Sequence, residues 1–224
     1  MRDVIRQFRE RQQEIENYFT LLENVIVKDA KFLFPDGTQI DVNIDLRHIL
    51  RANVFLLLYN LIESSISQAI EAIHIDIAKN DNLDFNSLTQ ELKKEIIGFV
   101  KKDVSVDTFI ENTGKISEYI LKYYPTSRAI FSGNVDAREI KKVGDKYGFS
   151  YQTDAQFTKN GKKLLTVKSK RNDLAHGFIS FKECGKDYPI EDIMETKSQV
   201  FAYLEQILQN ITHFVDNEQY KLAQ

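Results

Sequence analysis

One stretch of the chain, residues 46–80, constrains the fold more than any other. Its apolar residues recur with the period of an α-helix over about ten turns; they are Ile49, Leu50, Val54, Leu57, Leu61, Ile66, Ile70, Ile73 and Ile77. A second helical pattern, from about residue 190 to 220, has one apolar face formed by Ile193, Phe201, Leu204, Leu208, Ile211 and Val215. We expect these two long helices to pack against each other as the spine of a helical bundle.

The rest of the chain also favours helices. Only three prolines and nine glycines interrupt the 224 residues, so the sequence predicts a mainly α fold. A first helix is expected at about residues 3–24, with a buried stripe of Val4, Phe8, Ile15, Phe19 and Leu22. Weaker helical patterns cover residues 86–102, 106–123, 136–147 and 160–176, and irregular stretches at 124–135 and 148–159 join them. Bundles place such irregular stretches at their ends.

Residues 31–44 break the helical pattern. Apolar residues alternate here around the tight-turn signal Pro35-Asp36-Gly37, at Phe32, Phe34, Ile40, Val42 and Ile44. The alternative is the Pro-Asp element of a metal-dependent nuclease, but that site needs a downstream acidic-x-Lys, and Asp41-Val42-Asn43 lacks the lysine. We therefore predict one small β-hairpin.

The domain organisation is expected to be simple. The sequence has no internal repeat and no linker rich in Pro, Gly or Ser. We predict a single domain over residues 1–224. Residues 1–45 form the first helix and the hairpin, and residues 46–220 form the bundle, with an inserted segment at about 124–159.

Composition narrows the cellular setting. The single cysteine, Cys184, cannot form an internal disulfide, which suits a reducing cytoplasm. The longest apolar run, from Val54 to Tyr59, is too short to span a bilayer, so we expect no membrane insertion. The formal net charge is -3, so any contact with nucleic acid must be local rather than driven by an overall positive field.

The residues best suited to chemistry lie in 168–177, Lys-Ser-Lys-Arg-Asn-Asp-Leu-Ala-His-Gly. Phosphate-binding glycine loops, the Gly-x-Ser-x-Gly elbow and the His-Glu-x-x-His zinc motif are all missing from the sequence. Cutting RNA without a metal needs a proton acceptor, a proton donor and a cation to stabilise charge on phosphorus. Histidine titrates near neutral pH and arginine can hold two phosphate oxygens, so His176 and Arg171 fit these roles.

Helical spacing adds geometry to this hypothesis. Asn172 and His176 are one turn apart on the same helix face, so Asn172 could orient the ring or the phosphate, and Gly177 is placed to end the helix. One histidine is a poor acid-base pair, so we expect a homodimer in which two copies form a composite groove. The alternative is plainer, because a histidine before glycine and an Arg-Asn-Asp cluster are also common in solvated helix ends.

Three further groups of charged or titratable residues could contribute to the site. Lys168 and Lys170, with Lys159, Lys162 and Lys163, form a basic run that could contact an RNA backbone, although such runs are usually solvated. Glu63 is an acid in an apolar stretch and could orient Arg171 or His176, or simply face water. The other histidines, His48, His74 and His213, lack complementary ligands, so we assign no metal and no cofactor.

The segment Arg171-Asn172-Asp173-Leu174-Ala175-His176 resembles the Arg-x4-6-His signature of the HEPN superfamily, named for higher eukaryotes and prokaryotes nucleotide-binding. That family favours Asn after the Arg and carries the motif on the helix before the last one. Asn60-Leu61-Ile62-Glu63-Ser64 is similar to the polar interruption of an earlier helix in many members. With residues 131–136 and 146–149, the chain looks like a long bacterial branch found at restriction and phage-defence loci.

The resemblance implies a HEPN-type up-and-down helical bundle with extra helices. It also implies a metal-independent endoribonuclease that acts as a dimer by 2′-hydroxyl attack, as a toxin or phage-defence effector with an antitoxin or defence-system partner. The alternative is a non-catalytic interaction or nucleotide-binding module. Phe178 stands where adenylylated HEPN toxins have Tyr, which argues against that form of control. DNA binding through residues 136–147 is a third alternative, but no second helix completes a helix-turn-helix.

Overall fold

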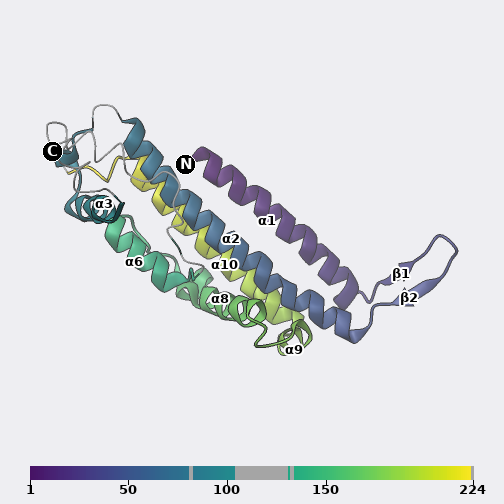
Figure 1. Cartoon of the computed structure of the whole chain (residues 1–224). Coiled ribbons are helices and arrows are strands. Elements are labelled where there is room, and N and C mark those ends of the chain that lie inside the picture. Colours follow the sequence, from purple (N-terminus) through teal and green to yellow (C-terminus); the bar gives the residue numbers. More distant parts are fainter. Residues whose placement is uncertain (81–82, 104–130, 132–133, 223–224) are drawn as a thin grey trace.

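The computed structural model describes residues 1–80, 83–103, 131 and 134–222, with the backbone alone at 99–103. It is a bundle of helices with one small hairpin that extends beyond the bundle end (Figure 1). The mainly α prediction is confirmed. The helix expected at 106–123, and the part of the inserted segment before residue 131, lie outside the described residues.

Two long helices form the spine. Helix α2, Ile44–Lys79, begins after Asn43, whose side chain accepts a hydrogen bond from the backbone N–H of Leu46 at 2.8 Å. Helix α10, Ile190–Asp216, begins after Pro189 and packs along α2 (Figure 1). Both helices were predicted, although α10 ends four residues before Tyr220.

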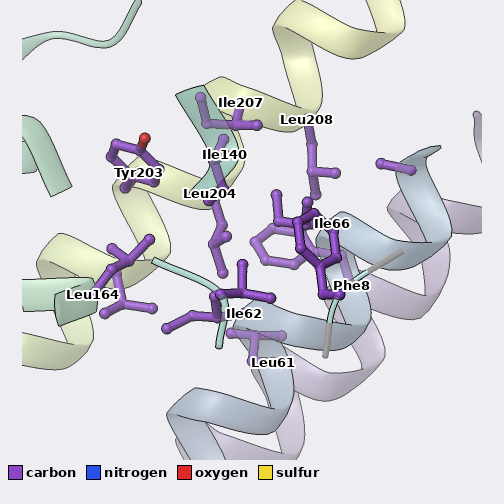
Figure 2. Close-up of a cluster of buried hydrophobic side chains, with 14 of the residues drawn as sticks. Phe8, Leu61, Ile62, Ile66, Ile140, Leu164, Tyr203, Leu204, Ile207 and Leu208 are labelled. Carbon is purple, nitrogen blue, oxygen red and sulfur yellow. The ribbon is translucent and has the colours of Figure 1, made fainter. Parts of the chain in front are cut away.

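Helix α2 is surrounded by other helices. α1, α8, α9 and α10 all pack on it, and Figure 2 shows Phe8 of α1 beside Ile66 of α2, with Leu204 and Leu208 of α10 in the same cluster. Each fully buried aliphatic or aromatic side chain contributes roughly 1.5–3 kcal/mol to the hydrophobic term. Within the described part of the chain, α2 alone is long and apolar enough to cross a membrane, and this packing makes it the core helix of the bundle.

Helix α1, Arg2–Leu22, buries the stripe expected from the sequence and continues into a π-helical turn, η1, Glu23–Val27. Strands β1, Lys31–Leu33, and β2, Gln39–Asp41, then pair antiparallel with Phe32 opposite Ile40. Gly37 takes φ +85° in the connecting turn, a conformation that favours glycine. The hairpin prediction is confirmed, but all six strand residues are exposed.

Shorter elements complete the described part of the fold. These are η2, Phe85–Ser87; α3, Gln90–Asp103; α6, Ala137–Tyr147; α7, Ala155–Thr158; η4, Lys159–Gly161; α8, Lys162–Ala175; and α9, Phe181–Lys186. α3 packs on α6, and α6 packs on α8 (Figure 1). The sequence patterns at 86–102, 136–147 and 160–176 therefore correspond to helices.

Helix α9 was not predicted. It begins with a capping box in which the Ser180 side chain accepts from the Glu183 backbone N–H and the Glu183 carboxylate accepts from the Ser180 backbone N–H. Its Gly185 lies against α2 so closely that an added Cβ would come within 1.8 Å of the His48 carbonyl oxygen. This contact fixes the chain just after the Arg-x4-His motif to the start of α2.

Candidate functional site

The motif occupies the C-terminal end of α8, and the backbone there closes in a defined turn. The N–H of Phe178 donates to the carbonyl oxygen of Asp173 at 2.9 Å, and the N–H of Gly177 donates to that of Leu174 at 3.2 Å. With Gly177 at φ +70°, these two bonds form a Schellman motif. The prediction that Gly177 ends this helix is confirmed, and His176 lies exposed at the helix end.

Arg171 is held in place by an aromatic ring. Its guanidinium carbon lies 4.5 Å from the centroid of the Tyr59 ring, and Nη1 donates to Oδ1 of Asn172 at 3.0 Å. Tyr59, on α2, is fully buried, and its hydroxyl accepts a hydrogen bond from the backbone N–H of Val135 at 3.2 Å. A cation over an aromatic face gains roughly 0.5–2 kcal/mol. Arg171 is therefore pre-positioned and only partly exposed.

Asn172 connects the motif to a distant part of the chain. Its Nδ2 donates to Oδ1 of Asn134 at 3.1 Å, while its own Oδ1 accepts from Arg171. Asn134 lies two residues before Asp136, the N-cap of α6. The sequence suggested that Asn172 orients the histidine ring or the phosphate; in the structure its two polar atoms contact Asn134 and Arg171.

Lys168 points to a buried carboxylate. Its Nζ forms an ion pair with Oδ2 of Asp136, which Arg138 also contacts at 3.2 Å. Oδ1 of Asp136 caps α6 by accepting from the backbone N–H groups of Arg138 and Glu139. Burial alone would raise the pKa of Asp136, but the hydrogen bonds from Lys168, Glu139 and Arg138 outweigh it and hold that pKa below its usual value.

The remaining lysines of the basic run differ in whether they are free to contact a ligand. Lys170 pairs with Asp173 at 3.4 Å, and Lys163 pairs with Glu195 at 3.2 Å. Burial opposes the charge of Lys170, but Tyr188 and Asp173 raise its pKa overall. Only Lys159 and Lys162 of this run are exposed and without an ion pair among the described residues.

Glu63 lies one turn after Tyr59 on α2 and lines a cavity of about 530 Å³ between α1 and α2, together with Arg11, Asn60 and Ser64. No ion pair joins it to Arg171 or His176 in the described part of the chain. Burial raises the pKa of Tyr59; the negative charge of Glu63 adds to this increase and the positive charge of Arg171 opposes it. Glu63 and Arg171 thus act with opposite charges on the same ring, that of Tyr59.

The family comparison agrees with the motif. A family profile described as MAE_28990-like HEPN matches residues 2–220. The chain belongs to the HEPN family. No match was found among curated proteins, and none among solved structures.

In this HEPN domain, the side chains that position the motif come from elements distant in sequence. Tyr59 supports Arg171, Asn134 holds Asn172, and Asp136 holds Lys168. Sequence reasoning gave none of these three a role. An aromatic residue in an apolar helix normally indicates core, so Tyr59 carried no signal of this role. The Asp136-x-x-Glu139 spacing is typical of a helix start and could have indicated that Asp136 is a cap.

The arrangement joins two kinds of group. A half-buried, permanently charged guanidinium is fixed on a ring, and an exposed imidazole lies five residues further along the same helix end. Such a pair can hold a phosphate oxygen with the arginine and transfer a proton with the histidine. The HEPN motif is thus accessible to a ligand at its histidine and rigid at its arginine.

Proposed function

We propose that this HEPN domain is a metal-independent endoribonuclease. The observation that carries the proposal is the state of Arg171, which is held over Tyr59 and bonded to Asn172 next to an exposed His176. A cation pre-positioned in a partly desolvated site stabilises developing negative charge without reorganising during the reaction. A purely structural arginine would more simply pair with a carboxylate, and Arg171 has none within 4 Å among the described residues.

The proposed reaction begins at the ribose. A base removes the proton of the 2′-hydroxyl, whose oxygen attacks the adjacent phosphorus, and the bond to the 5′-oxygen breaks as an acid protonates that oxygen. The products are a 2′,3′-cyclic phosphate and a free 5′-hydroxyl. His176 acts as acid or base. Arg171 binds the non-bridging oxygens. Asn172 positions Arg171 by accepting its hydrogen bond while it donates to Asn134.

Two proton transfers require two groups. Each chain contributes one histidine to the motif, so we propose that two copies meet across their α8 ends and that each supplies one His176 and one Arg171. Glu63 is proposed to act through Tyr59, as a positioning residue. Lys168 and Lys170 are proposed as RNA contacts that exchange their present partners, Asp136 and Asp173, for phosphates.

The biological role proposed is that of a toxin or phage-defence effector in the cytoplasm, restrained by an antitoxin or another protein of the same defence system. The first test is expression. Induction of the wild type is expected to arrest growth and fragment cellular RNA, whereas His176→Ala, produced at the same level, does neither. His213→Ala is the matched control, because His213 is an exposed histidine of α10 that contacts Asn217. Arrest by the His176→Ala variant would contradict the proposal.

A second candidate is a non-catalytic interaction or nucleotide-binding module. One observation favours it: within the described residues, the His176 ring has no hydrogen-bond partner to fix its orientation, and its aromatic contact is with Phe178 at 5.6 Å. A catalytic histidine is normally oriented by a second group. If purified dimer binds RNA or a nucleotide without cleaving either, this candidate replaces the first.

A further inference from the structure

Phe178 is the most exposed of the large apolar side chains in the described part of the chain, at 80%. Its backbone is fixed rather than loose, because its N–H donates to Asp173 and the preceding Gly177 completes the Schellman turn. The next apolar residues, Ile179 and Phe181, pack against the core. The fold therefore holds one aromatic ring out in solvent on a rigid support.

The ring lies beside the motif. The centroids of the Phe178 and His176 rings are 5.6 Å apart, with an angle of 32° between the planes. The surrounding chain is small or polar, with Ala175, Gly177 and Ser180 all exposed. The core of a protein interface is a contiguous apolar patch. A single ring beside the histidine proposed to act at the phosphate is instead the arrangement that single-stranded RNA uses, with a base stacked on the ring and the phosphate bound nearby.

We propose that Phe178 is the floor of a nucleobase subsite, on which a base next to the scissile phosphate stacks. The inference rests on the proposed RNA-cleaving function and assigns it a base-binding residue, Phe178. A base within a duplex is already stacked on its neighbours and cannot present its face to Phe178. Stacking is tolerant of sequence because every base has a π-face, so the subsite selects for single strands rather than for a particular base.

The test measures binding apart from cleavage. The probe is a short fluorescein-labelled RNA with methylated 2′-hydroxyls, which cannot attack phosphorus, and a second probe of the same length lacks bases. Fluorescence anisotropy at one fixed salt concentration gives the dissociation constants. Phe178→Ala is expected to weaken binding of the base-bearing probe by roughly 5- to 150-fold and to leave binding of the abasic probe unchanged. Phe178→Trp is expected to keep the wild-type affinity.

The matched control is Phe157→Ala, which removes another exposed phenyl ring, on α7, and is expected to change neither affinity. If Phe178→Ala weakens the affinity for both probes equally, the stacking subsite is overturned. Unchanged binding by Phe178→Ala, while Arg171→Ala abolishes binding, would also overturn it, and that result would leave the proposed function standing.

Two other results separate the remaining explanations. If neither probe binds the wild type in an Arg171-dependent way, the proposed function fails and the subsite fails with it. If Phe178→Ala instead converts a dimer to monomers in sedimentation, the ring belongs to a protein interface and the subsite is overturned.

Discussion

The contact between Asp136 and Lys168 provides a quantitative test of how the site is supported. It joins the start of α6 to the middle of α8, two residues from the Asn134 that holds Asn172. The Asp136 side chain is 2% exposed and that of Lys168 is 16% exposed. Breaking a fully buried pair costs roughly 3–5 kcal/mol, because a charge remains without a partner. Since Lys168 keeps some access to water, we expect about 2–3 kcal/mol for Asp136→Asn.

Asparagine can also cap the helix, so Asp136→Asn measures the effect of removing the carboxylate charge alone. The reciprocal Lys168→Met is expected to cost about 1–2 kcal/mol, since Asp136 keeps its bonds to Arg138 and Glu139. The double variant removes both charges together and is expected to lose at least about 1 kcal/mol less than the sum of the single losses. Urea unfolding at neutral pH, followed by the helical circular dichroism signal, gives the three free energies. Losses that add within about 0.5 kcal/mol would refute the coupling.

Three further predictions use other contacts. Tyr59→Leu removes the ring under Arg171 and is expected to lower the RNA cleavage rate by about 3- to 30-fold, the equivalent of the cation–π contact, while Tyr59→Phe stays near wild type; equal rates for both would contradict this. Ser180→Ala breaks the capping box of α9 and is expected to lower the free energy of unfolding by about 1 kcal/mol in the same urea assay. The pKa of Asp136 is depressed in the folded state, so the ionised carboxylate stabilises the folded protein. This stabilisation is complete above the ordinary carboxyl pKa of about 3.9 and is lost as pH falls through the lower pKa of the folded state. In an acid titration, Asp136→Asn should therefore lose less of its free energy of unfolding than the wild type does.

The long elements were predictable because their signals are local. The apolar stripes of α1, α2 and α10 and the Asp-Gly turn of the hairpin can each be recognised within a short window of sequence. Helix α9 is too short to show a period in its apolar residues, although Ser180-x-x-Glu183 is a local signal for a helix start. Its position depends on Gly185 meeting the backbone of α2, a tertiary contact that no local pattern encodes.

The site residues likewise divide into those with a local sequence signal and those placed by tertiary contacts. Arg171 and His176 could be predicted as candidate site residues because the motif is contiguous in the sequence. The membership of the chain in the HEPN family is confirmed by the match over residues 2–220. Tyr59 and Asn134 were not found, because each meets the motif across a long separation in sequence. The pairing of Lys168 with Asp136 likewise depends on how α6 packs on α8, so composition alone suggested a free basic run where the structure has several internal ion pairs.

Arg171 and His176 are proposed to cut RNA without a metal. The most direct measurement incubates the purified protein with a mixed RNA pool in EDTA and analyses the ends of any fragments. We expect fragments ending in 2′,3′-cyclic phosphate from the wild type and from His213→Ala, and intact RNA from a folded His176→Ala. Tight binding of RNA by the wild type with no cleavage would contradict the proposed ribonuclease activity.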